Sequence, residues 1–190
     1  MEEVSEDVRR ELSPGEQLHW WGRPRQGVVF RGSDILLIPF SLLWCGFAVF
    51  WEYSVLRMPK ADMFFSLWGV PFVVIGLYFV VGRFIAEARE RRRTHYAVTS
   101  ERVLILSGLF RRRVTSLNLR TLSDISLSES RSGEGTITFG NQRPMGLFFG
   151  GMAGWPGAER YLGPRFDLVP NAKMVYDIVR KAQLGSSLGA

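Results

Sequence analysis

The chain has 190 residues, 46% of them hydrophobic, a formal net charge of +6 and one cysteine. A single cysteine excludes an internal disulfide framework and a thiolate metal site. The positive charge does not indicate nucleic acid, because the basic residues gather beside two apolar segments and the chain begins with an acidic stretch that would repel phosphate. We therefore expect no nucleic-acid partner.

The acidic stretch opens a region that we assign to residues 1–33, an acidic N-terminal tail followed by a segment that leads to a membrane. Beyond it, residues 35–51 and residues 63–81 contain no charged side chain. A core helix of a soluble protein normally carries charge on the face that meets water. We therefore predict a two-helix transmembrane hairpin over residues 34–90.

The predicted membrane spans cover about residues 35–56 and 63–85. A helix over the second range would be roughly 35 Å long at about 1.5 Å per residue, which is enough for a hydrocarbon core of about 30 Å. Asp34 and Asp62 immediately precede the two ranges and are suited to cap the helices. A buried helical hairpin in a globular protein is the alternative interpretation.

Basic residues lie mainly on the side of the two spans that leads to the ends of the chain. The loop between the spans offers only Arg57 and Lys60. The positive-inside rule then predicts a multi-pass protein with both termini in the cytoplasm. The basic residues on the terminal side are Arg23, Arg25, Arg31, Arg83, Arg89, Arg91, Arg92 and Arg93.

Residues 91–184 form the second predicted domain, in which apolar and polar residues alternate in short runs. This period of two predicts strands, and the turn-prone residues between the runs predict an antiparallel sheet. Past Asn171 the apolar residues follow a helical stripe, which predicts an amphipathic helix that covers the sheet. We expect residues 185–190 to be a disordered tail. The alternating apolar pairs are Tyr96 and Val98, Val103 and Ile105, Leu117 and Leu119, Ile125 and Leu127, Ile137 and Phe139, and Phe166 and Leu168.

Several stretches together resemble the membrane-anchored form of the bacterial PH-like domain family. The resemblance covers about residues 12–182 and is carried by "LSPGEQLHWWGRP", "THYAVTSERVLILSGLF", "LNLRTLSDISL", "GTITFG" and "VYDIVRKA". It implies a PH-type β barrel or half barrel with a capping helix, at the cytoplasmic face of a bacterial inner membrane. It implies little about activity, because domains of this family serve chiefly as anchored modules. A long glycine-rich insert after Gly140 departs from the family pattern.

The expected fold class is an α+β membrane protein. It combines a transmembrane helical hairpin with a PH-like antiparallel β barrel or curved sheet that a C-terminal helix caps.

We expect no catalytic, cofactor or metal site. The chain has two histidines, His19 and His95, each beside an aromatic residue and neither near a carboxylate pair that the sequence can place. Metalloprotease, nucleophile-elbow, P-loop, Cys-x-x-Cys and dinucleotide-binding motifs do not occur in the sequence.

Two arginine triplets are the candidate sites for a membrane surface or a lipid headgroup. An arginine held near an anionic leaflet contributes roughly 1 kcal/mol to binding. The first triplet also has a plain interpretation as a topology signal, and the second as a solvated strand end. The triplets are Arg91, Arg92 and Arg93 at the end of the second apolar helix, and Arg111, Arg112 and Arg113 at the start of a strand.

Residues 145–157, "MGLFFGGMAGWPG", combine large apolar side chains with glycines. Water tolerates such a loop poorly. It either packs over the open end of the barrel, enters the membrane interface or docks on a partner. The candidate interface residues are Leu147, Phe148, Phe149, Met152 and Trp155.

These observations favour a non-catalytic, membrane-anchored module that binds a protein partner or anionic lipid headgroups at the cytoplasmic surface of the inner membrane. The alternative is an accessory or assembly subunit of a larger inner-membrane protein complex. In that case the spans would associate with a membrane-protein partner, or with a second copy of the chain, through small residues. The candidate small residues are Gly46, Gly69, Gly76 and Gly82.

Overall fold

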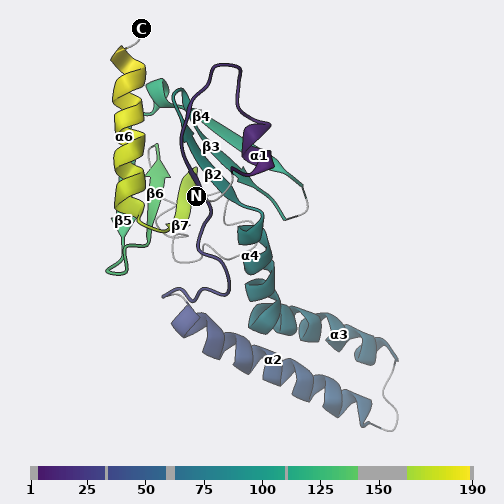
Figure 1. Cartoon of the computed structure of the whole chain (residues 1–190). Helices are drawn as coiled ribbons and strands as arrows, with labels where there is room; N and C mark the ends of the chain where they lie inside the picture. The colour runs from purple at the N-terminus through teal and green to yellow at the C-terminus, as the bar shows by residue number, and fades with distance from the viewer. Residues whose placement is uncertain (1–3, 33, 59–62, 110, 141–161, 189–190) are drawn as a thin grey trace. The chain divides into compact units, whose positions relative to one another are not determined.

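The computed structural model describes residues 4–32, 34–58, 63–109, 111–140 and 162–188. The chain forms two compact units. The helical unit comprises Val28–Glu87, and the sheet unit combines Met1–Gly27 with Ala88–Ala190. The helical unit is therefore an insertion in the sequence of the sheet unit (Figure 1).

The helical unit begins with α2 (Asp34–Leu56) and continues with α3 (Met63–Leu77). A π-helical turn, η1 (Tyr78–Gly82), then leads without a break into α4 (Arg83–Arg92). The helices over Asp34–Leu56 and Leu67–Arg92 are long and apolar enough to cross a membrane, by length and composition.

Helices α2 and α3 pack antiparallel through small residues. A Cβ atom added at Gly76 would lie 3.0 Å from the Cα atom of Cys45, and one added at Gly69 would collide with the Glu52 carboxylate. These two glycines therefore serve packing inside the hairpin, which differs from the expectation that they face other spans. Gly46 has open space where a side chain would be.

The described part of the sheet unit contains two antiparallel sheets. The first has the strand order β1-β2-β3-β4, and the second has the order β5-β6-β7. The first consists of β1 (Leu18–Gly22), β2 (His95–Thr99), β3 (Arg102–Ser107) and β4 (Arg113–Asn118). The second consists of β5 (Ile125–Glu129), β6 (Gly135–Phe139) and β7 (Arg165–Val169).

The N-terminal region supplies an edge strand. We expected residues 1–33 to be a tail before the membrane, but Trp20 and Trp21 in β1 pair with Val98 and Ala97 in β2. The side chain of Trp20 also packs on the ring of Phe166, with 5.8 Å between ring centroids. The sheet domain therefore begins before the helical unit and resumes after it.

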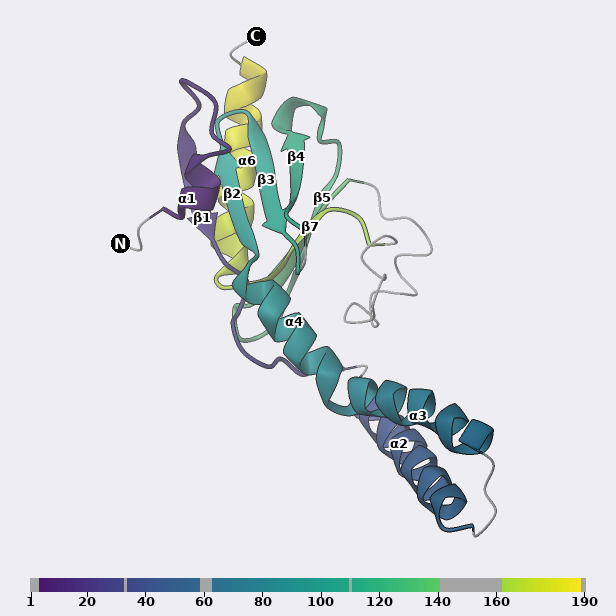
Figure 2. The ribbon, with the colours of Figure 1, turned by 90° about the vertical axis from the view of Figure 1, so that its right-hand side faces the viewer.

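A hydrophobic core lies between the two sheets and α6 (Ala172–Leu188). Phe166 is at its centre and stacks on Tyr96 at 4.5 Å between ring centroids. Helix α6 lies across both sheets (Figure 2), and a 3-10 turn, η2 (Leu119–Thr121), lies beneath it between β4 and β5. Two separate sheets replace the closed barrel that was one of our expectations. Helix α6 also extends through the first residues of the tail that we expected to be disordered.

The alternating pattern locates most of the strands, but it misses β1 and assigns Leu119 to a strand, although this residue begins η2. It also fails within β7. Phe166 is fully buried as expected, but the second inward residue of β7 is Val169 rather than Leu168. Leu168 has a positive φ of 53°, so the pleat is interrupted there and the following side chain turns inward.

The first sheet is covered on its other face too. Val8, in the short helix α1 (Glu6–Arg9), is fully buried against Ala97, Leu104 and Leu106. Helix α1 lies on the face of this sheet opposite to α6 (Figure 1). As a result, every residue of β2 is buried.

Candidate functional site

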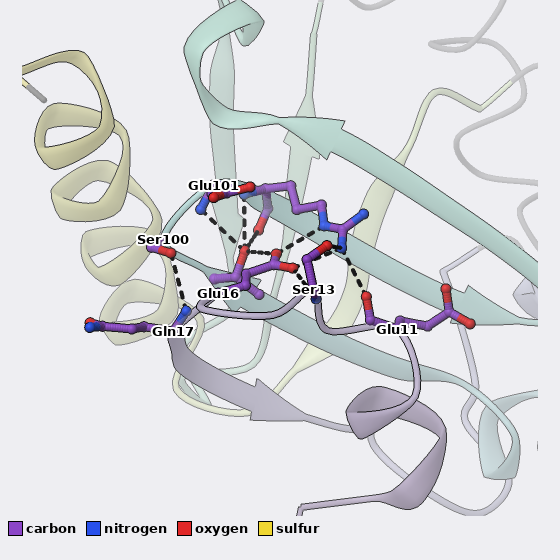
Figure 3. A network of polar contacts seen from close by, with 8 residues as sticks. Glu11, Ser13, Glu16, Gln17, Ser100 and Glu101 are labelled. Atoms are coloured by element: carbon purple, nitrogen blue, oxygen red, sulfur yellow. Dashed lines mark hydrogen bonds and ion pairs between the residues drawn. The ribbon is translucent and has the colours of Figure 1, made fainter. Parts of the chain in front are cut away.

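A buried carboxylate fixes the N-terminal segment to the first sheet. The side chain of Glu16 is fully buried, and its Oε2 lies 2.7 Å from Nη2 of Arg102. Its Oε1 accepts hydrogen bonds from the Thr99 hydroxyl at 2.6 Å and from Nε of Arg102 at 2.9 Å. Figure 3 shows Glu16 at the centre of this network. The hydrogen bonds from Arg102 lower the pKa of Glu16 from 4.5 to about 2.

The same network holds the loop on either side of Glu16. The backbone N–H of Ser13 donates to the Glu16 carboxylate at 2.8 Å, and Nη2 of Arg102 donates to the carbonyl oxygen of Glu11 at 2.8 Å. Thr99 and Arg102 belong to the "YAVTSER" motif, and Glu16 belongs to "LSPGEQ". The network explains both motifs as structural, because they bind each other across the sequence of the inserted helices.

The candidate site lies where the strands of the first sheet begin or end, on the side opposite to this network, and we call this side the pocket edge. Because the strands are antiparallel, β1 and β3 end there and β2 and β4 begin there. A pocket of about 330 Å³ lies at this edge. It is lined by Asp7, Arg92, Arg93, His95, Leu106, Ser107, Gly108 and Arg112.

In the first arginine triplet, Arg91 is buried in the fold, whereas Arg92 and Arg93 line the pocket. Arg91 is 8% exposed, and its Nη2 donates to the carbonyl oxygen of Gly27 at 2.7 Å. Arg91 therefore stabilises the fold and does not meet the expectation of a membrane-surface residue. Arg92 and Arg93 are exposed and line the pocket. Nη1 of Arg93 also donates to the carbonyl oxygen of Leu109 at 2.6 Å, which ties the end of α4 to the loop between β3 and β4.

In the second arginine triplet, one residue lines the pocket and two do not. Arg111, Arg112 and Arg113 are all exposed, but only Arg112 of the three lines the pocket. The turn that positions it depends on Gly108, which has a φ of +136°. A Cβ atom at Gly108 would collide with the carbonyl oxygen of Arg111, so the turn requires glycine.

Arg112 is bound to the acidic N-terminal segment. Its Nη2 lies 2.9 Å from the Glu11 carboxylate and 3.9 Å from the Asp7 carboxylate. The same nitrogen donates to the carbonyl oxygen of Asp7 at 3.1 Å. From the sequence we interpreted the acidic residues only as a source of repulsion. The four-residue helix α1 is too short to show a hydrophobic period, so the sequence does not reveal that this segment folds onto the sheet.

The pocket is suited to bind an anion. Three of its lining residues are arginines, Arg92, Arg93 and Arg112, and guanidinium groups bind phosphate and carboxylate through paired hydrogen bonds. His95, 5% exposed at the start of β2, adds an imidazole to the wall. Within the described residues, no group of three or more histidine, cysteine, aspartate or glutamate side chains is arranged to hold a metal ion.

The apolar insert candidates, Leu147, Phe148, Phe149, Met152 and Trp155, lie outside the residues that the structure describes.

The comparisons with known proteins identify one family. A family model described as "Bacterial PH domain" matches residues 35–182, which include most of the helical unit and most of the sheet unit. A search of curated proteins found no match, and a search of solved structures found none either.

Proposed function

The chain belongs to the bacterial PH domain family, and from this we propose that it is a non-catalytic binding module anchored in the bacterial inner membrane. Its ligand is the anionic headgroup of a lipid in the cytoplasmic leaflet. The observation that carries the proposal is the pocket formed by Arg92, Arg93 and Arg112. Family members serve as binding modules in general, and the pocket supplies the chemistry for an anion.

The membrane anchor is supported by the exposed apolar surface of the helical unit. In the most apolar 18-residue stretch of α2, only 22% is buried. In the most apolar 18-residue stretch of Leu67–Arg92, 17% is buried. Large apolar side chains such as Ile35, Leu43 and Met63 are at least 75% exposed. A soluble monomer rarely exposes so much apolar surface, whereas a lipid bilayer covers it.

The position of the pocket in the chain supports a headgroup as the ligand. The chain leaves the first sheet at Gly22 and returns to it at His95, and both residues lie at the pocket edge of that sheet. The last residues of the candidate span, Arg92 and the preceding turn of α4, lead directly to the pocket. If both spans cross the bilayer, the basic residues at their ends place this edge and both termini on the cytoplasmic side.

The proposal is tested by extracting the full chain into native nanodiscs and identifying the retained lipids by mass spectrometry. We expect one anionic lipid per chain, and its loss in the variant Arg92→Gln/Arg112→Gln. The matched control is Arg120→Gln/Arg131→Gln, which removes two exposed arginines elsewhere on the sheet unit and should keep the lipid. Equal lipid retention by both variants would contradict the proposal.

A second candidate function is an accessory or assembly subunit of a larger inner-membrane complex. It is favoured by the open space around Gly46, since a small residue on a helix surface lets a second helix approach closely. Gly46→Leu should then release a membrane-protein partner, or a second copy of the chain, from the nanodisc while the bound lipid stays. A chain that carries no protein partner before the substitution would exclude this candidate.

A further inference from the structure

We propose that the acidic N-terminal segment, residues 4–12, is a built-in competitor for the anion pocket. Without a ligand, the carboxylates of Asp7 and Glu11 form ion pairs with Arg112. A phosphate-bearing headgroup displaces these carboxylates when it binds. The inference rests on the proposed function, because it concerns the regulation of the same pocket.

The contacts of Arg112 carry the argument. Its guanidinium group lies 2.9 Å from the Glu11 carboxylate and 3.9 Å from that of Asp7, and Asp7 itself lines the pocket. An oxyanion ligand would bind Arg112 through the same hydrogen-bond donors. The carboxylates and the ligand therefore compete for one group.

The pairing is weak enough to be exchanged. The side chain of Arg112 is 46% exposed, that of Asp7 is 51% exposed and that of Glu11 is 26% exposed. Ion pairs with this exposure to water are screened and contribute little to stability. A ligand can thus replace them without the unfolding of the sheet.

The segment stays attached to the sheet at two points when its carboxylates are displaced. Val8 is fully buried against the first sheet, and Glu16 is bound to Thr99 and Arg102. These two anchors lie on either side of Glu11 in the sequence. The carboxylates therefore remain close to Arg112 at a high effective concentration, and they lower the apparent affinity for every anion that enters the pocket.

The test measures the affinity of the full chain for glycerol 3-phosphate, a soluble headgroup fragment, by calorimetric titration in uncharged maltoside micelles at low salt. The variant Asp7→Asn/Glu11→Gln should bind about fivefold more tightly than the original chain, as expected for the removal of two exposed ion pairs. The matched control is Glu6→Gln/Asp177→Asn, which removes two carboxylates from exposed ion pairs with Arg10 and Lys173. It should change the affinity by less than about twofold, since neither carboxylate pairs with Arg112 and exposed charges are screened by water and salt.

The outcomes separate the inference from the proposed function. Weaker or unchanged binding by Asp7→Asn/Glu11→Gln would overturn the competitor and leave the pocket as an anion site. An absence of binding by the original chain and by both variants would overturn the proposed function and the competitor together. A parallel titration with inorganic phosphate distinguishes the source of the ligand. If the ligand is a lipid headgroup, glycerol 3-phosphate should bind more tightly than inorganic phosphate. Equal affinities would mean that the acidic segment competes with free phosphate instead of a headgroup.

Hydrogen exchange of residues 4–12 provides a second readout. Displaced carboxylates should leave the segment less protected, so its exchange should accelerate when glycerol 3-phosphate is added. Slower exchange would mean that the segment closes on the ligand instead of competing with it, which would overturn the inference.

Discussion

Each of the two units buries one carboxylate against an arginine, but the two units differ in what surrounds that pair. Glu16 and Arg102 in the sheet unit, and Asp34 and Arg83 in the helical unit, are both separated by 2.7 Å. The first pair lies beside two hydrophobic clusters, whereas the described part of the helical unit buries few apolar side chains, such as Ala48 and Val55. The sheet unit thus has a core of its own, whereas the described part of the helical unit relies on the Asp34–Arg83 ion pair and on close contacts at Gly69 and Gly76.

The largest effect should follow from Arg83→Gln in the helical unit. Asp34 is then left buried without its cation, a change that typically costs about 3–5 kcal/mol. Hydrogen exchange of α2 and α3 in the full chain should accelerate, while exchange of the sheet unit should not.

The double variant Asp34→Asn/Arg83→Gln is the control for this prediction. It removes both charges and should recover much of the lost protection, since no buried charge is left alone. Equal losses in the single and double variants would show that the ion pair does not hold the helical unit together.

Glu16→Gln should have a slightly smaller effect in the sheet unit. The lowered pKa of Glu16 corresponds to about 3 kcal/mol of stability above pH 4.5, and this stability is lost as the pH falls from 4.5 toward about 2. Urea unfolding of the full chain, followed by exchange in β2 and β3, should show this acid dependence in the original chain. The variant should be less stable at pH 7 and should lack the dependence; an unchanged pH profile would contradict the account.

Gly108→Ala should cost less stability, about 1–3 kcal/mol, because it strains a turn with positive φ and forces the Arg111 carbonyl aside. Gly133→Ala is the matched control, since Gly133 also has a positive φ but has open space around it. Thermal unfolding should show the greater loss for Gly108→Ala. Equal losses would mean that the crowding at Gly108 is relieved without cost.

The smallest effect on stability should follow from Arg112→Gln, under about 1 kcal/mol, because the side chains of its ion pairs are between 26% and 51% exposed. The same change should weaken binding of glycerol 3-phosphate. This combination distinguishes Arg112 from Arg102, whose replacement would unpair a buried carboxylate. A large stability loss on Arg112→Gln would assign Arg112 to the fold rather than to the pocket.

Sequence periodicity predicted most helices and strands because it reflects which faces are buried. It missed β1, since five residues within a polar region carry no period and their partner strand follows the inserted helices. It also grouped Arg91 with Arg92, although successive residues on a helix point about 100° apart and only one of the two side chains is buried. The pairing of Glu16 with Arg102 joins residues that only the folded sheet brings together.

The most direct test of the central claim is to identify what fills the pocket in a native membrane. A photo-crosslinking amino acid at Ser107, which lines the pocket, would capture the occupant of the full chain for mass spectrometry, with Ser128 on β5 as the exposed control position. We predict an anionic phospholipid crosslinked at Ser107 and none at Ser128. A peptide at Ser107, or equal lipid capture at both positions, would contradict the account.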